Sequence, residues 1–387
     1  MRKAKLNTIF LGFLVFDLLL LPRFLLSTPI SFFIMIPLVT MIGRISAREA
    51  LAYTGMVTIF ISSVMYGIEK SGSLEVENIK RAVQLSLIMG LVLIDYGSVN
   101  YLKLTSILRK VLCLFYLICG AFLLLMLSNQ DLYESVVVSI YPESKTMISE
   151  NLASLRYSFH FTDPNSLGYL VVMCFVLACL INYTARVKSI IFCVSLTLII
   201  STQSRGALLA FFFVSVVYWA QYLDFKAKLN SVLLLLLVFG IFISVFFEYV
   251  DFYWELYEKR QRLEEVSGKG IGGGRLDVWY YFFSNFNPNP FFGVGYYLER
   301  EGVMFRPHSD FIRMQLSYGT LIFFVFLLFF NGLDRKLLML WAAFFVPFMI
   351  NTIIDDYRLF GVFVAFYFIL KWEGRVSKPS YNLFVRK

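Results

Sequence analysis

Apolar runs recur along this chain from residue 7 to residue 371, and no polar domain interrupts them. Hydrophobic residues make up 59% of the sequence and charged residues only 16%, which is too little polar surface to coat a water-soluble globule of 387 residues. The bilayer must therefore be the solvent for most of the chain. We predict one integral membrane domain that covers residues 1–387.

A transmembrane helix needs about 20 predominantly apolar residues to cross the hydrocarbon core of a bilayer. By this criterion the sequence predicts an all-α polytopic membrane protein with about 12 transmembrane helices. We expect the spans at about 7–26, 29–43, 51–68, 82–102, 108–128, 166–184, 189–202, 207–223, 230–250, 313–331, 337–354 and 358–371. Two long loops remain, at about 129–165 and 251–312, and loops of this length in a compact helical protein are usually functional.

The distribution of basic residues indicates the orientation. If the N-terminus is inside, the segments on that side of the membrane carry 19 Lys or Arg against four acidic residues. Because an excess of basic residues marks cytoplasmic loops, both termini are predicted to be cytoplasmic and both long loops to face outward. The formal charge of +9 is explained by these short loops, and we expect no nucleic-acid partner.

Several kinds of site are disfavoured by the sequence. All five cysteines fall inside apolar runs without a CxxC spacing, so we interpret them as packing residues and expect neither disulfides nor a cysteine metal site. The absence of GxxxxGK[ST], HExxH and GxSxG argues against an ATPase, a zinc protease and a serine hydrolase.

Four acidic residues are candidates for a functional role. Asp17 and Asp95 fall within predicted spans, where an acidic side chain is a functional candidate by default. Asp355 and Asp356 are adjacent and precede the last predicted span, and we expect them to cap a helix rather than hold a metal ion. The first outer loop, around Arg23 to Pro29, carries no carboxylate and so offers no acidic metal site.

His308 is the stronger of the two histidine candidates. It lies in PHSDFIRMQLSYG, at the outer mouth of the tenth predicted span, where Ser309 or Asp310 can cap the helix. An imidazole in such a wet position titrates near neutral pH and can take a proton as a general base. The alternative is a polar residue at the start of a helix with no chemical task.

His160 fits that alternative better. It precedes the turn TDPNSLG, in which Asp163 and Asn165 are expected to cap a helix and Pro164 to occupy its first turn.

Three arginines are expected on the same outer side as His308, although they lie far apart in the sequence. They are Arg156 in the first long loop, Arg205 in TQSRGALLA and Arg275 in GGGRLDVW. Convergent guanidinium groups suit a diphosphate, because each presents a planar set of donors to phosphate oxygens. The alternative is that each arginine snorkels to lipid headgroups, and the short QSRG turn makes this alternative weakest for Arg205.

The motifs occur in a fixed order: RYSFHFTDPNSLG, SRGALLA, GGRLDVW followed by PNPFFGVGYY, and PHSDFIRMQLSYG. In this order, over about residues 156–319, they resemble the bacterial O-antigen polymerase and ligase family. The resemblance implies a GT-C-like glycosyltransferase architecture in the inner membrane, with a periplasmic active site. It also implies that Arg205, Arg275 and Arg156 bind the diphosphate of the lipid-linked donor, that His308 assists the acceptor hydroxyl, and that no metal ion or cofactor is required.

The resemblance implies an inverting glycosyltransferase. Its partners would be the undecaprenyl-diphosphate-linked glycan donor and acceptor, the lipid bilayer and a chain-length regulator protein. The sequence has PHSDF where ligases usually show His followed by Asn and a leucine, which favours polymerase over ligase. The ligase, a flippase or other transporter of lipid-linked oligosaccharide, and a scaffold of a polysaccharide-export complex remain as alternatives.

The charge distribution makes a prediction about topology that reporter fusions can test. Fusions at residues 145 and 265 should report a periplasmic position, and fusions at residues 105 and 226 a cytoplasmic one, because the 19-to-4 excess of basic residues fixes the cytoplasmic side. A cytoplasmic signal at residue 265 would contradict the placement of the second long loop and of Arg275 with it.

Overall fold

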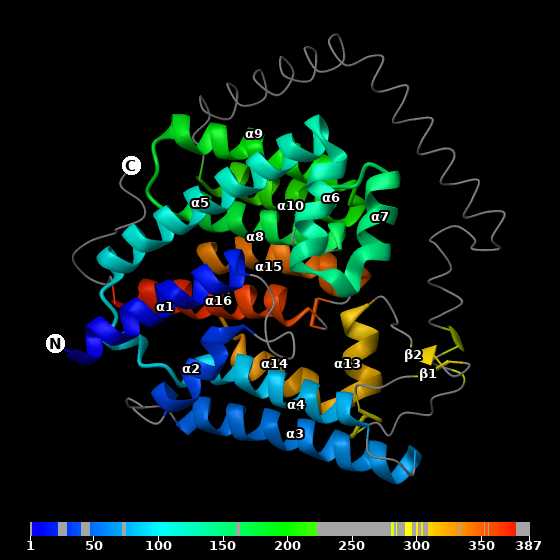
Figure 1. The fold of residues 1–387 in the computed structure, drawn as a ribbon. Coiled ribbons are helices and arrows are strands. Elements are labelled where there is room, and N and C mark those ends of the chain that lie inside the picture. The colour runs from blue at the N-terminus through cyan, green and yellow to red at the C-terminus, as the bar shows by residue number, and fades with distance from the viewer. Residues whose placement is uncertain are drawn as a thin grey trace. The chain divides into compact units, whose positions relative to one another are not determined.

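The computed structural model describes residues 2–21, 29–39, 47–71, 75–159, 163–222, 280–281, 284, 291–295, 299–300, 303–304, 309–332, 334–351, 353–354 and 356–376 (Figure 1). The chain divides into two compact units, Met1–Val214 with Pro288–Lys387, and Ser215–Asn287. Most of the described residues belong to the first unit, whose fold is given below. The prediction of one membrane domain over the whole chain stays a prediction.

The described secondary structure is helical except for one short antiparallel pair of strands. The helices are α1 (Arg2–Leu20), α2 (Ile30–Val39), α3 (Ala47–Ser71), α4 (Val76–Met89), η1 (Gly90–Leu93), η2 (Tyr96–Ser98), α5 (Tyr101–Ser128), α6 (Gln130–Ile140), η3 (Pro142–Ser144), α7 (Lys145–Ala153), α8 (Pro164–Leu180), α9 (Ala185–Thr202), α10 (Arg205–Tyr222), α13 (Asp310–Tyr318), α14 (Leu321–Phe329), α15 (Arg335–Ile350) and α16 (Tyr357–Val376). The strands are β1 (Glu299–Arg300) and β2 (Val303–Met304).

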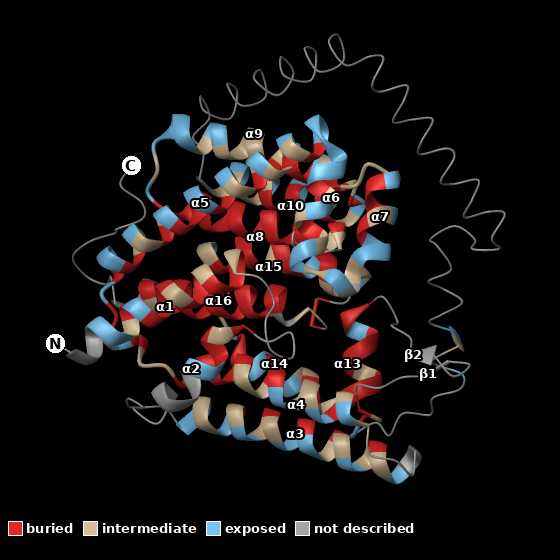
Figure 2. Ribbon diagram, in the orientation of Figure 1, coloured by how far each residue is buried: buried red, intermediate tan, exposed pale blue. Residues whose placement is uncertain are grey.

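Helices α8 and α16 form the core of the first unit. Figure 2 shows both of them buried over nearly their whole length. Helix α8 packs against α9, α15 and α16, and α16 also packs against α1, α4 and α15. Both helices are apolar all round, as expected for helices that are surrounded by other helices.

Three described helices are long and apolar enough to cross a membrane individually: Ala47–Glu69 within α3, Tyr101–Ser128 and Ala185–Thr202. They correspond to the predicted spans at 51–68, 108–128 and 189–202. The predicted span at 230–250 lies outside the described residues, and the total of 12 spans and the positions of both termini stay predictions.

The predicted span at 82–102 differs from the structure, because it is not one continuous helix. Helix α4 ends at Met89 and is followed by the short helices η1 and η2, and α5 starts only at Tyr101. Asp95 lies in the break between η1 and η2, where its backbone carbonyl accepts a hydrogen bond from Nδ2 of Asn7 at 3.2 Å. It therefore sits beside the start of α1 and not in the middle of a span.

The predicted span at 313–331 also differs, because it consists of two helices. Helices α13 and α14 meet at an angle of 118°, in the form of a broken span or a re-entrant loop. Gly319 ends α13 with a φ of +74°, a backbone angle that residues other than glycine rarely adopt. The apolar sequence predicted a straight helix because periodicity alone does not register a single glycine-dependent turn.

The segment 291–295 docks against this turn. The backbone N–H groups of Val294 and Gly295 donate to the carbonyls of Leu316 and Ser317 at 2.9 and 3.1 Å. A Cβ atom at Gly293 would lie 2.0 Å from the backbone carbon of Ser317. The close approach thus explains the glycines of PNPFFGVGYY: they let one backbone pair with another where α13 ends.

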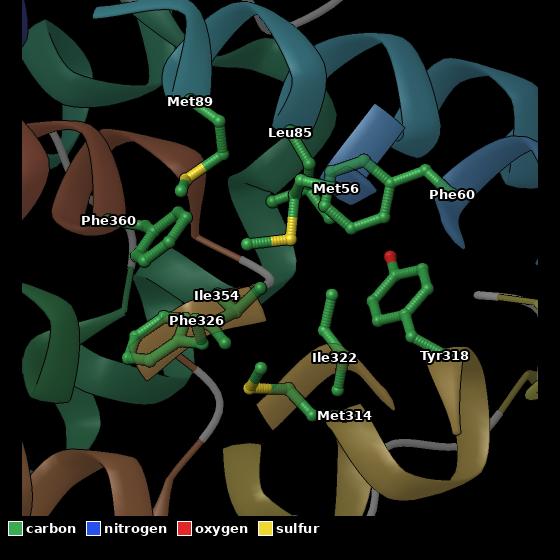
Figure 3. A pocket seen from close by; sticks show the side chains of 10 residues that line it. All are labelled: Met56, Phe60, Leu85, Met89, Met314, Tyr318, Ile322, Phe326, Ile354 and Phe360. Atoms are coloured by element: carbon green, nitrogen blue, oxygen red, sulfur yellow. The ribbon is translucent and has the colours of Figure 1, made fainter. Parts of the chain in front are cut away.

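A small apolar cavity lies beside the same turn. Side chains from α3, α4, α13, α14 and α16 converge on it, and Tyr318 lies edge-on to Phe60 with ring centroids 5.0 Å apart (Figure 3). Its volume of about 10 Å³ is at most room for a single water molecule. We interpret it as imperfect packing around the bend rather than as a ligand site.

The docked segment makes a prediction about stability. Replacement of Gly293 by Ala should destabilise the protein by about 1–3 kcal/mol, because the new methyl group meets backbone atoms that cannot rotate away. Thermal unfolding of the purified protein in detergent measures the effect. Gly120→Ala is the matched control, since nothing lies within 4 Å of a Cβ atom at that position in α5. Equal midpoints for the two variants would contradict the docking.

Candidate functional site

The structure describes two of the four predicted site residues. Arg156 and Arg205 lie in the described part of the chain, whereas His308 and Arg275 lie outside the described residues, as does His160. The geometry of the candidate site is therefore built from the two arginines and from the helix that begins directly after His308.

Arg156 binds the turn that precedes Arg205. Its Nε donates to the carbonyl of Thr202 at 3.3 Å, and Nη2 donates to Oδ1 of Asn165 at 3.4 Å. The next residue, Tyr157, donates its backbone N–H to the carbonyl of Ser201 at 2.8 Å. Two motifs about fifty positions apart in the sequence thus form one junction, hereafter the 154–159/201–205 junction.

The start of α8 contributes to the junction as well. The carboxylate of Asp163 accepts hydrogen bonds from the backbone N–H groups of Asn165 and Ser166 at 3.0 and 3.3 Å, and Pro164 is the first helical residue. The predicted cap at Asp163 is confirmed. Asn165 does not cap the helix; it lies in the first turn and holds Arg156.

Left-handed backbone conformations gather in the junction. Among the described residues, the non-glycine residues with positive φ are Leu155, Phe159 and Gln203, with φ between 50° and 52°. Each such residue costs on the order of 1–3 kcal/mol, and such costs persist where surrounding contacts impose them. Here Nε2 of Gln203 donates to the carbonyls of Ser154 and Leu155 at 3.1 and 3.5 Å, so the strained residues hold one another.

Arg205 is the first residue of α10 and its side chain is exposed. Ser204 precedes the helix, and its Oγ accepts a hydrogen bond from the N–H of Ala207 at 3.3 Å. The guanidinium therefore stands at a helix N-terminus, where the positive end of the helix dipole adds to its charge. This arrangement can bind a phosphate or diphosphate group.

The close packing around Gly206 explains why the SRG turn ends in glycine. A Cβ atom there would lie 2.1 Å from the hydroxyl oxygen of Tyr169 on α8 and 3.0 Å from Cδ1 of Ile350 at the end of α15. The turn at Gly206 thus lies against α8 and the end of α15.

The turn that follows α15 contacts Asp310, the first residue of α13. The carboxylate of Asp310 is fully buried and accepts hydrogen bonds from the backbone N–H groups of Ile353 and Ile354 at 2.7 and 3.0 Å. Ser309 caps α13 through Oγ, which accepts from the N–H of Ile312 at 3.5 Å. The cap predicted at Ser309 is confirmed, and Asp310 serves the α15–α16 turn instead of its own helix.

The structure thus connects the SRG turn with the start of α13 through the α15–α16 turn. The sequence analysis missed this role of Asp310 and also the buried Arg313 and Arg358, each 1% exposed. Arg358 donates to the carbonyl of Leu21 at the end of α1. The available signal was the presence of charged residues beside predicted spans, which indicates a buried polar contact but not its partner.

The remaining acidic candidates have structural partners. Asp356 accepts from the N–H of Arg358 at 3.1 Å, which confirms its predicted role as a cap, and Asp355 lies outside the described residues. The buried carboxylate of Asp17 accepts from the N–H of Ser31 at 2.6 Å. Within the described ranges, no three His, Cys, Asp or Glu residues lie close enough together to hold a metal ion.

An aromatic cluster supports the junction from the side of α6. The hydroxyl of Tyr157 donates to the carbonyl of Cys119 at 2.7 Å, and the N–H of Phe159 donates to the hydroxyl oxygen of Tyr133 at 3.0 Å. Burial raises the pKa of Tyr133 to about 12 and raises that of Tyr157 as well, so both remain neutral at physiological pH. The segment 129–165, predicted as a loop, is thus largely formed by α6, η3 and α7.

The described part of the chain is consistent with a predominantly helical membrane protein, and three of its helices are long and apolar enough to cross a membrane. Residues 190–327 match the family model described as O-antigen ligase. The match confirms the resemblance to the O-antigen ligase and polymerase family over these residues. It does not distinguish the two branches. A search of curated proteins finds no match.

The strain at Gln203 makes a prediction with an unusual sign. Within a helix, glycine is less stable than alanine by about 0.5–1 kcal/mol. At Gln203 the order should reverse, because alanine pays about 1–2 kcal/mol for a left-handed conformation that glycine adopts freely. Thermal unfolding of Gln203→Gly and Gln203→Ala measures the difference. The control pair Thr197→Gly and Thr197→Ala, on the exposed face of α9, should keep the usual order.

Proposed function

We propose that this protein polymerises undecaprenyl-diphosphate-linked oligosaccharide repeat units at the periplasmic face of the inner membrane, as an O-antigen or related surface polysaccharide polymerase. The observation that carries the proposal is the contact between Arg156 and the SRG turn, inside a chain whose residues 190–327 match the O-antigen ligase model. Family membership supports glycosyl transfer, and the junction supports the binding of the lipid-linked diphosphate.

The proposed reaction forms one glycosidic bond and breaks one bond to diphosphate. A hydroxyl of one lipid-linked repeat unit attacks the anomeric carbon of another glycan from the face opposite the diphosphate, so the configuration inverts. His308 takes the hydroxyl proton, and polyprenyl diphosphate leaves. Negative charge grows on the leaving group in the transition state, so Arg205, Arg275 and Arg156 stabilise that state more than the ground state. No step requires a metal ion.

Polymerase is favoured over ligase by one local feature. The sequence His308-Ser309-Asp310 stands where ligases usually show His followed by Asn, and Asp310 holds the α15–α16 turn. The ligase that transfers the glycan to lipid A core is the second candidate, and the family match supports it equally. The two reactions share a donor and differ in the acceptor.

A transporter is disfavoured by the positions of the buried charges. A flippase requires polar groups along a path through the bilayer. In the described part of the chain, the buried charged side chains lie within one or two turns of helix ends. They are Asp17, Asp310, Arg313, Arg358, Lys371 and Glu373.

The proposed reaction can be tested with purified protein. Lipid-linked repeat units alone, in excess chelator, should give a ladder of lipid-linked polymers. His308→Ala should lower the rate by about 10²–10⁴-fold while the protein folds normally, because a positioned base contributes that much. Products formed only when lipid A core is added would identify a ligase. Activity lost to chelator and restored by a divalent ion would contradict the metal-independent mechanism.

A second prediction distinguishes a diphosphate-binding arginine from one that snorkels. Arg205→Lys keeps the charge but loses the planar pair of donors, so it should be impaired nearly as much as Arg205→Ala, by about 10²–10³-fold. Snorkelling predicts normal activity for the lysine variant, since lysine reaches headgroups equally well. The measurements are ladder length in cells at matched membrane abundance and binding of the lipid-linked donor to purified protein. Full-length ladders from Arg205→Ala would remove Arg205 from the site.

A further inference from the structure

A second cavity, which is partly polar, lies at the end of α3 that is remote from the candidate site. Its volume is about 260 Å³. Its lining comes from the start of α3, from η1, from the end of α14 with the residues that follow it, and from α16. The lining residues are Arg48, Glu49, Ala52, Val92, Leu328, Phe329, Asn331 and Lys371.

The position of the cavity separates it from the glycosyl-transfer site. Gly67, near the other end of α3, packs against the carbonyl of Val294, which belongs to the segment docked on α13. Arg48 and Gly67 are 19 positions apart, so about 28 Å of helix separates the cavity from that segment. The cavity residues Arg48 and Lys371 belong to segments that the charge distribution predicts to be cytoplasmic.

The charges that line the cavity favour an anion. Arg48 and Lys371 contribute two positive charges and Glu49 one negative charge. Lys371 is only 8% exposed, and its ammonium lies 5.5 Å from the ring centroid of Tyr367 and 5.8 Å from that of Phe368. A cation removed from water in this way attracts an anion more strongly than a fully hydrated one.

The nearest other carboxylate on α16 has its own cationic partner. Glu373, two residues after Lys371, accepts a hydrogen bond from Nζ of Lys336. Lys336 therefore offsets the negative charge of Glu373. The remaining walls are apolar, because Ala52, Val92, Leu328 and Phe329 line the cavity together with the polar groups. A ligand with a phosphate and an adjoining apolar part matches this combination.

We propose that the cavity binds the phosphodiester of an anionic phospholipid from the cytoplasmic leaflet. Arg48 and Lys371 bind the phosphate, whereas Asn331 and Glu49 accept hydrogen bonds from headgroup hydroxyls. The single negative charge of the phosphodiester offsets the net positive charge of the lining. The phosphate chemistry is also that of free phosphate, and the leaflet is the source that fits the apolar walls.

The experiment compares three proteins in nanodiscs: the wild type, Arg48→Gln and Arg335→Gln. Arg335 is the matched control, because it is also an exposed arginine at the start of a helix on the same predicted side, and it does not line the cavity. The binding of phosphatidylglycerol against a phosphatidylcholine background is measured by native mass spectrometry and by thermal unfolding. Arg48→Gln should weaken binding about ten-fold, and Arg335→Gln less than two-fold.

A second arm adds inorganic phosphate to pure phosphatidylcholine nanodiscs. Stabilisation by phosphatidylglycerol that depends on Arg48, with none from inorganic phosphate, supports the proposal. Equal stabilisation by inorganic phosphate would overturn the lipid as the source. Equal weakening by Arg48→Gln and Arg335→Gln would overturn the cavity, because it would indicate only the general attraction of basic loops to anionic lipids.

Discussion

The hydrogen bonds from Ile353 and Ile354 to the buried carboxylate of Asp310 connect the turn between α15 and α16 to the start of α13. Backbone N–H groups in apolar surroundings cost several kcal/mol when they lack a partner. The turn between α15 and α16 would carry such groups, and a carboxylate supplied by α13 satisfies two of them at once. Helix α13 has only nine residues, too few to be stable alone, so the same bonds also fix its start. Helix α13 begins two residues after His308, the proposed base, which lies outside the described residues.

Local features of this structure were predictable from the sequence, and contacts between distant segments were not. The caps at Asp163 and Ser309 follow from residues within one helical turn, and both are confirmed. The break at Gly319 escaped prediction because its flanks are apolar, and only the backbone of segment 291–295, paired with α13, shows why the helix must end there. The contact of Arg156 with Thr202 was anticipated only as a convergence of charges. Sequence spacing contains no information on which loops meet.

Strain at the 154–159/201–205 junction is consistent with a site that must be rigid before its substrate arrives. Leu155, Phe159 and Gln203 adopt left-handed conformations, and all three lie within three residues of a predicted site motif residue. A guanidinium that stabilises growing charge is most effective when no reorganisation is needed at the moment of reaction. The free energy that holds these residues in place comes from the folded core beneath them, including α8, which is buried along nearly its whole length. The burial of α8 thus helps to offset the strain at the junction.

Arg205 and Lys371 lie in different surroundings, and the difference agrees with the tasks proposed for them. Arg205 is exposed at a helix start, two residues after the left-handed Gln203. Lys371 is buried against aromatic rings, so its charge is desolvated and no turn of special conformation holds it. Catalysis rewards only interactions that strengthen in the transition state, so the proposed role of Arg205 would offset the cost of the left-handed conformation at Gln203. Binding of a lipid headgroup rewards the ground state alone, for which a desolvated ammonium in a cavity is sufficient.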